Sequence, residues 1–284
     1  MDAVPYEFVD RVFIKLKEYN VSQLSKRALE APMWREVARV YKQKLQSLTV
    51  DVWMDAENGR LAHKIKNDDY QQFSIDDLLK LDPRFTRIQR LYCRFNGSSK
   101  NMIKTAVDKF QSLLAYVSHC DVDHAIIQLP ENRPTELYNA LADVDIMSEE
   151  LIVNHFLGAE DFAKKQMKSF SLRGLVIKAG NWSAALISAD LEAFVCQPQF
   201  ERLRCDFECF DNENYKRIVA YWRTAKPTND WSIIVVTNSN KADEFASWLT
   251  PHGEHEFKER IGDFDLTVFC KNDACILDFC TLLD

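Results

Sequence analysis

The chain has 284 residues, of which 46% are hydrophobic and 28% charged, and its formal net charge is −7. That length can bury a core without metal ions or disulfides. Because no apolar run reaches the ~18 residues of a membrane span, and phosphate binding depends on clustered cations, we expect neither a membrane nor a nucleic acid as partner.

The N-terminus and the cysteines indicate the compartment. The opening Met1-Asp2-Ala3-Val4-Pro5 lacks the basic and apolar regions of a secretory signal. The eight cysteines are too sparse for a disulfide scaffold, and most lie in apolar stretches, as buried thiols do. We therefore expect a reducing compartment, cytoplasmic or nuclear.

Residues 1–48 have the periodicity of three short helices. Pro5 suits the first position of a helix, Ser22 can cap a second helix that Pro32 ends, and a third begins near Met33. The first helix has a stripe of apolar residues at Phe8, Val9, Val12, Phe13 and Leu16. This segment holds nine Lys or Arg and six Asp or Glu, so it is basic while the remainder is acidic. A basic head suits an acidic protein partner.

The same segment resembles an F-box. That motif opens on a Leu-Pro-x-Glu-like sequence, continues through apolar helices and closes on Trp followed by a basic residue. Here Val4-Pro5-Tyr6-Glu7 matches the opening, Val12–Leu16 and Val21–Leu24 the middle, and Trp34-Arg35-Glu36-Val37 the end. Val4 replaces the usual leucine, and the valine-cysteine-lysine stretch before the tryptophan is absent. The beginning Met-Asp-x-Val-Pro-x-x-Phe is also similar to the F-box-associated families expanded in nematodes.

The resemblance implies a substrate-recognition subunit of a Skp/cullin/F-box type ubiquitin ligase. Residues 1–48 would be an F-box-like module that binds a Skp-type adaptor, and residues 49–284 would select the target protein. The residues that the resemblance places at the adaptor are Val4, Pro5, Phe8, Val12, Leu24 and Trp34. A plain three-helix cap over the end of the following domain is the alternative.

After Leu48 the pattern changes to that of strands. Thr49–Met54 and Leu61–Ile65 alternate around Asn58-Gly59, which predicts a β-hairpin. A short helix over Asp76–Leu81 then leads to a strand over Ile88–Phe95.

From there helices and strands alternate. The predicted helices are Met102–Val117, Thr135–Leu141, Phe162–Phe170, Ala184–Val195, Tyr215–Trp222 and Ala242–Leu249. The predicted strands are Ala125–Leu129, Leu151–Val153, Leu172–Ile177, Leu203–Cys209, Trp231–Val236 and Phe264–Phe269. Strand starts recur roughly every thirty residues in the last units, as in stacked repeats. The prediction is an α/β chain whose body is a degenerate leucine-rich-repeat-like solenoid with a parallel, right-handed, curved sheet. An open α/β sheet is the alternative, although 7 glycines leave it without glycine-rich nucleotide turns.

Motifs that carry chemistry are weak in this sequence. It contains no P-loop, dinucleotide fingerprint or nucleophile elbow. The His252–His255 pair lacks the i, i+4 spacing of a zinc helix, and cysteines four apart on a strand lie too far apart, about 13 Å, for one zinc ion. Acids at Asp121 and Asp123, and at Asp206 and Glu208, could serve general acid–base catalysis, but loop acids and a solvated strand face explain them more simply, and no nucleophile is identifiable beside them. We predict a protein that is not an enzyme and needs no cofactor.

A binding surface on the exposed strand face remains. The residues that alternate with buried ones are Tyr92, Arg94, Gln128, Lys178, Arg202, Arg204, Asp206, Glu208, Asp265 and Thr267. We predict that they contact the target protein, with arginine and tyrosine contributing most. The alternatives are a stoichiometric binding, antidote or decoy protein without ligase linkage, and an enzyme of unfamiliar type.

Overall fold

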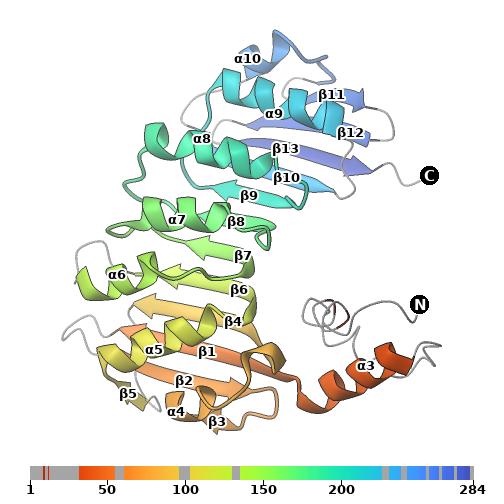
Figure 1. The fold of residues 1–284 in the computed structure, drawn as a ribbon. Coiled ribbons are helices and arrows are strands. Elements are labelled where there is room, and N and C mark those ends of the chain that lie inside the picture. Colours follow the sequence, from red (N-terminus) through yellow and green to blue (C-terminus); the bar gives the residue numbers. More distant parts are fainter. Residues whose placement is uncertain are drawn as a thin grey trace. The chain divides into compact units, whose positions relative to one another are not determined.

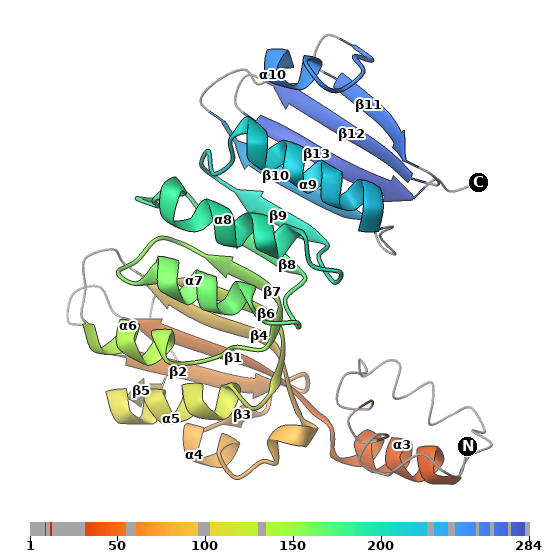
Figure 2. The same ribbon diagram turned by 45° about the horizontal axis from the view of Figure 1, so that its top comes forward.

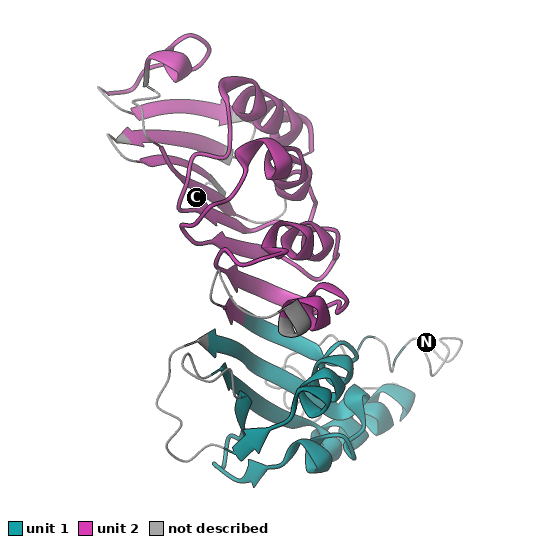
Figure 3. Cartoon of the chain, turned by 90° about the vertical axis from the view of Figure 1, so that its left-hand side faces the viewer, with its two compact units in different colours: residues 1–125 teal, residues 126–284 magenta. Residues whose placement is uncertain are grey.

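A computed structural model gives the fold, which is mixed α/β. It describes Val9, Val12, 32–54, 61–95, 103–129, 135–225, 230–237, 242–253, 256–261, 264–271 and 274–281. The chain divides into two compact units, residues 1–125 and 126–284, and the boundary falls within β6 (Asp121–Gln128) (Figure 3). The predicted domain boundary between residues 48 and 49 lies inside a strand of the first unit. No helix of the described residues is long and apolar enough to cross a membrane.

The N-terminal segment is described mainly by α3 (Pro32–Lys44). Proline lacks an N–H that the first turn of a helix would leave without a partner, so Pro32 suits the first position of α3, one residue before the predicted start near Met33. Val37, Ala38 and Tyr41 of α3 are buried with Val9 and Phe85 in one cluster. Val9 and Val12 are helical, as expected. The rest of the first two predicted helices lies outside the described residues.

Unit 1 is built on a mixed sheet. Its strands are β1 (Gln46–Met54), β2 (Leu61–Asn67), β3 (Gln72–Phe73), β4 (Thr86–Phe95) and β5 (Ile103–Thr105). Antiparallel pairing of β1 with β2 confirms the predicted hairpin, and β4 lies parallel to β1 on its other side. The helix predicted from Met102 begins only at Val107, because Ile103–Thr105 pairs with β2 instead.

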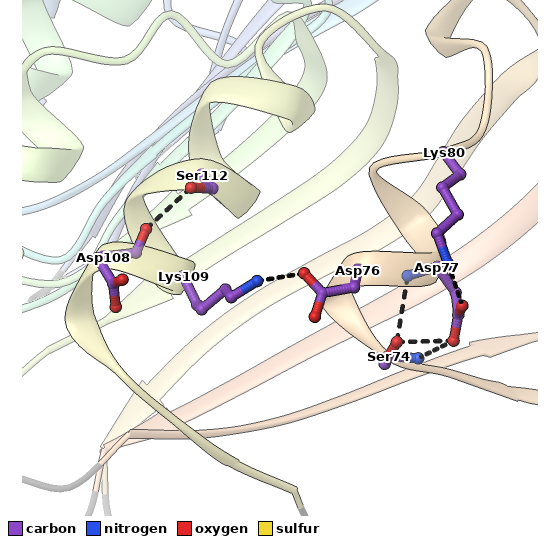
Figure 4. A network of polar contacts seen from close by, with 7 residues as sticks. All are labelled: Ser74, Asp76, Asp77, Lys80, Asp108, Lys109 and Ser112. Carbon is purple, nitrogen blue, oxygen red and sulfur yellow. Dashed lines mark hydrogen bonds and ion pairs between the residues drawn. The ribbon is translucent and has the colours of Figure 1, made fainter.

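Helices cover one face of this sheet. They are α4 (Ile75–Leu78) and α5 (Val107–Val117), with the 3-10 turn η1 (Pro83–Phe85) between them in sequence. The α4 helix is shorter than its prediction, and Ser74 and Asp77 form a capping box at its start. An ion pair between Lys109 and Asp76 joins the starts of α5 and α4 (Figure 4).

Unit 2 repeats a strand-and-helix pattern. Its parallel strands are β7 (Ser148–Val153), β8 (Gly174–Ile177), β9 (Arg202–Cys205) and β10 (Trp231–Val236), paired in that order. The helices are α6 (Thr135–Ala142), α7 (Ala159–Met167), α8 (Ala184–Val195) and α9 (Asn212–Ala225). These helices lie side by side on one face of the strands (Figures 1 and 2). The predicted alternation is confirmed here.

The C-terminal part of unit 2 differs from the prediction. Its elements are α10 (Ala242–Ala246), β11 (Glu256–Ile261), β12 (Phe264–Lys271) and β13 (Ala274–Thr281). β13 pairs antiparallel with β10, β12 with β13, and β11 with β12. The expectation that Phe264–Phe269 continues the parallel repeat is therefore wrong. Only two residues join each of these strands to the next, whereas a parallel connection needs about a dozen or more.

An aromatic core fixes the helices on the strands of unit 2. Phe194 of α8, Trp222 of α9 and Trp231 of β10 surround Phe200, with ring centroids 5.4 to 6.5 Å from its ring. All four side chains are buried, and full burial of a large apolar side chain contributes about 1.5–3 kcal/mol. This packing holds one face of the strands against the helices and leaves their other face free of helices in the described part of the unit (Figure 3).

Candidate functional site: two strand faces

An apolar row crosses the helix-free face of unit 2. Cross-strand partners share a face of a sheet, so the register of the strands places these side chains side by side. The row, called here the central row, consists of Ile152, Val176, Arg204, Ile234, Ile276 and Phe269. Phe269 is 37% exposed and the three isoleucines are half-buried. Five of the six are apolar, which is unusual for a face that no helix covers.

Charged residues line one side of the central row. Glu150 of β7, Arg202 of β9 and Asp278 of β13 occupy the neighbouring row, with Gly174 between the first two. The Arg202 guanidinium lies 3.5 Å from the Glu150 carboxylate. Burial raises the pKa of Asp278. This side therefore presents both signs of charge.

On the other side of the central row, the carboxylate of Asp206 contacts two cationic side chains. Asp206 accepts a hydrogen bond of 2.9 Å from Nε of Arg204, and Lys178 Nζ lies 3.6 Å from its second oxygen. Lys178 and Asp206 sit just beyond the ends of β8 and β9, where their backbone N–H groups donate to the preceding strands. Asp206 therefore holds the guanidinium of Arg204 in place within an apolar surface.

Unit 1 has a strand face of different chemistry. The residues of this surface, called here the cationic strand face, are Asp51, Trp53, Lys64, Lys66, Arg90, Tyr92 and Arg94. The centre of the Arg94 guanidinium lies 3.8 Å from the centroid of the Tyr92 ring, a close cation–π stack. Burial raises the pKa of Asp51, while Arg94, Lys66 and Lys64 act to lower it.

Two donors of this face are buried without a hydrogen-bond partner. They are Nε1 of Trp53 and Nε of Arg94. The two residues are cross-strand neighbours on β1 and β4. Most buried polar groups are hydrogen-bonded. Two unsatisfied donors on adjacent residues therefore make this corner of the sheet a candidate binding site.

The structure brings several predicted target-binding residues together. Tyr92 and Arg94 meet in unit 1, and Lys178, Arg204 and Asp206 meet in unit 2. Arg202 lies in the adjacent row, which continues through Thr267 of β12 to Lys258 of β11, and Asp265 lies two residues before Thr267 on β12. Gln128 is the last residue of β6 and is half-buried.

Glu208 is the exception among the predicted residues. The predicted strand Leu203–Cys209 ends at Cys205, so the alternation of faces does not extend to Glu208. Its side chain instead lines a pocket of about 300 Å³ with Ser188, Cys209 and Asp211. Asp211 accepts from the Asn214 backbone N–H at the start of α9, so it acts as a helix cap there.

The prediction missed residues on both faces. Asp51 and Trp53 belong to a strand that was expected to alternate, and their parity already placed them opposite the buried Val50 and Val52. Ile276 lies on β13, a strand without a predicted counterpart. The central row as a whole depends on cross-strand register, which no local pattern shows.

The predicted adaptor residues are only partly described. Val4, Pro5, Phe8 and Leu24 lie outside the described residues. Val12 is helical and half-buried, and Trp34 packs partly buried against the α3 cluster. The indole of Trp34 therefore takes part in packing within unit 1.

The acidic residues, cysteines and histidines considered above for catalysis or metal binding lie in ion pairs, in the core or on the surface. Asp123 accepts from Nε of the buried Arg87 at 2.8 Å, so its carboxylate forms part of an ion pair. Cys205 and Cys209 are buried, and so are Cys270 and Cys275, as core cysteines would be. His252 is exposed, whereas His255 lies outside the described residues. Within the described ranges, no three or more His, Cys, Asp or Glu side chains converge as a metal site would require.

Comparisons with protein-family models, curated proteins and solved structures found no significant match. Any role of the two strand faces therefore follows from their own residues.

Proposed function

We propose that this protein recognises another protein through the helix-free strand face of unit 2, and that it does so without catalysing a reaction. The central row is the observation that carries the proposal. Exposed apolar surface bordered by polar groups is characteristic of protein-binding sites. Full burial of an exposed isoleucine or phenylalanine side chain contributes about 1.5–3 kcal/mol, and the half-buried side chains of the row would each contribute a part of this when a partner covers them.

Arg204 and Phe269 are the strongest candidates for dominant contacts. Arginine and aromatic residues are common among the few side chains that contribute most to binding. Asp206 already orients the Arg204 guanidinium, which reduces the entropy lost when a partner binds it. Lys178, Arg202 and Thr267 border the row, and Asp265 lies one row beyond Thr267; all four would set specificity more than affinity.

We further propose that residues 1–48 are an F-box-like module and that the body is a degenerate leucine-rich-repeat-like domain. The resemblance of Val4-Pro5-Tyr6-Glu7 and Trp34-Arg35 to an F-box supports the first part, and the parallel succession of β7 to β10 supports the second. The protein would then be the substrate-recognition subunit of a Skp/cullin/F-box ubiquitin ligase in the cytosol or nucleus. It would hold a target lysine near the conjugating enzyme at high effective concentration.

A second candidate function is stoichiometric binding without a ligase, as in an antidote or decoy protein. The packing of Trp34 against the cluster of Val9, Tyr41 and Phe85 favours it, because an indole used in that way is less available to an adaptor. Substitution of the predicted adaptor residues Pro5 and Phe8 by aspartate distinguishes the two, because it leaves α3 and β1 in place. The ligase function requires that this variant loses adaptor copurification and target degradation, whereas a decoy with the same substitutions masks its target equally well.

A photo-crosslinking experiment tests the binding face. A crosslinking amino acid at Ile234 is expected to capture a defined partner, and the same group at Leu186, which is 55% exposed on α8, serves as the control. Ile234→Asp together with Ile276→Asp is then expected to abolish binding of that purified partner, while Leu186→Asp leaves it intact. Equal capture from both positions, or full binding by the double variant, would contradict the proposal.

A further inference from the structure

We propose that the cationic strand face of unit 1 is a second binding site, and that it takes a short acidic segment of a partner protein. The site goes beyond the target contact on unit 2. It lies wholly within unit 1 and involves a different chemistry, charge and aromatic stacking rather than an apolar row.

Charge is the first argument. Lys64, Lys66, Arg90 and Arg94 lie on adjacent strands, and Asp51 is the one acidic residue among the side chains of this face. None of the four cations forms an ion pair with a described residue. The excess of three positive charges occurs in a chain whose net charge is −7. An acidic ligand is therefore the complementary one.

Other arginines of the described chain do have carboxylate partners, in contrast to Arg90 and Arg94. Arg87, on the same strand as Arg90, is paired with Asp123, and Arg173, just before β8, is paired with Glu201, just before β9. Like charges gathered on one sheet face are destabilising. Repulsion among the cations near Arg90 and Arg94 therefore lowers the stability of the fold. Residues that lower stability in this way are common at functional sites.

The unsatisfied donors are the second argument. An indole and a guanidinium donate hydrogen bonds but accept none, so Trp53 Nε1 and Arg94 Nε both require an acceptor. Ionised carboxylates only accept, and hydrogen bonds from arginine to a carboxylate are among the strongest in proteins. Because the cation–π contact with the Tyr92 ring fixes the position of the Arg94 guanidinium, this planar donor is already placed for such a group.

Asp51 favours a peptide over a nucleic acid. Lys64 and Tyr92 are its cross-strand neighbours, so its carboxylate lies in the middle of the cations. A phosphate backbone carries a charge at every unit and would meet this carboxylate unfavourably. A peptide offers backbone N–H donors between its acidic side chains, and Asp51 can accept from one of these.

Fluorescence anisotropy with the full-length protein tests the proposal. The probe is a fluorescein-labelled peptide of alternating glutamate and serine, and the same peptide with glutamine in place of glutamate measures the contribution of charge. We expect saturable binding of the acidic peptide, at least tenfold weaker binding of the glutamine peptide, and a loss of affinity as salt is raised.

Variants localise the binding. Lys64→Gln with Arg90→Gln is expected to weaken binding of the acidic peptide at least tenfold and to leave the melting temperature unchanged or higher, because repulsion is relieved. A merely structural role for these residues would lower the melting temperature. Arg94→Lys keeps the charge but loses the planar stack, so its expected effect is intermediate. Lys164→Gln on α7 with Lys168→Gln at its C-cap removes the same charge from unit 2 and is the control.

Three results would overturn the site: equal binding of the glutamine peptide, unchanged affinity of the Lys64 and Arg90 variant, or tight binding of a labelled oligothymidylate where the peptide fails. Ile234→Asp with Ile276→Asp is expected to leave peptide binding unchanged. This site and the proposed target face can therefore fail independently.

Discussion

Glu150 on β7 reaches Arg202 on β9, with 3.5 Å between carboxylate and guanidinium, by crossing the strand that separates them. The crossing is possible because Gly174 occupies the intervening position of β8. A Cβ at that position would lie 3.2 Å from Cγ of Glu150. The absence of a side chain at Gly174 therefore allows Glu150 and Arg202, two charged residues that border the central row, to pair across β8.

Gly174→Val is expected to separate this pair. The β-branched side chain fills the space that Glu150 crosses, so the carboxylate must turn away from Arg202. A double-mutant cycle with Glu150→Gln and Arg202→Gln should give a coupling energy of about 0.2–1 kcal/mol in the natural chain, as for an exposed pair. The coupling should vanish in the Gly174→Val background, and its persistence there would contradict the crossing.

His63 should make the fold sensitive to acid. Its ring is buried, Nδ1 is hydrogen-bonded to Thr105 Oγ1 and Nε2 has no partner. Burial lowers the pKa of His63 below its ordinary value of 6.5. Between that lowered pKa and 6.5 the unfolded state binds more protons, so the free energy of unfolding falls as pH falls through this window.

Urea unfolding at a series of pH values measures this effect. His63→Gln retains a side chain that can bond Thr105 but does not titrate, so its stability should fall less between about pH 7 and pH 5. The comparison isolates His63 from Asp51 and Asp278, whose pKa values are raised by burial and whose contributions have the opposite sign. Parallel curves for the two proteins would rule out His63 as the cause.

The buried thiols should resist alkylation in the folded protein. Burial raises the pKa of Cys93 and of Cys120 to about 12, and that of the half-buried Cys196 to about 11. Because the thiolate is the reactive species, we expect Cys196 to react first with iodoacetamide and the other two only after unfolding. Mass spectrometry of timed digests gives the order, and rapid labelling of Cys93 would contradict the packing of β4.

Removing only one member of the ion pair between Arg87 and Asp123 should lower the free energy of unfolding. The Arg87 side chain is 7% exposed, so Asp123→Asn takes a charged acceptor away from a buried cation. We expect a loss of about 1–3 kcal/mol in the free energy of unfolding. Arg87→Met combined with Asp123→Leu should recover much of it, because the cation and this acceptor are removed together. A double variant less stable than Asp123→Asn would contradict this account.

Local pattern predicted several elements closely. Helix Ala184–Val195 and strand Trp231–Val236 have the predicted bounds, since each is a mainly apolar stretch flanked by residues that break it. β11 and β13 were missed. Gly262-Asp263 and Asn272-Asp273 between these strands are residues typical of two-residue hairpins, and this signal was available in the sequence.

The site was less predictable than the elements. The alternation of side chains along a strand correctly placed Tyr92, Arg94, Arg202 and Arg204 on the face away from their buried neighbours, because this alternation is a property of a single strand. It failed at Glu208, since the strand ends at Cys205 and parity has no meaning in a loop.

The sequence by itself determined which residues form helices and strands over most of the body, and which side chains of each strand avoid the core. Both follow from periods of a few residues, which are local. Only the tertiary structure decided that Ile152, Ile234 and Ile276 form one row and that Gly174 lies beneath Glu150. The register between these strands comes from contacts between residues distant in the chain, and these contacts have no counterpart in the order of neighbouring amino acids.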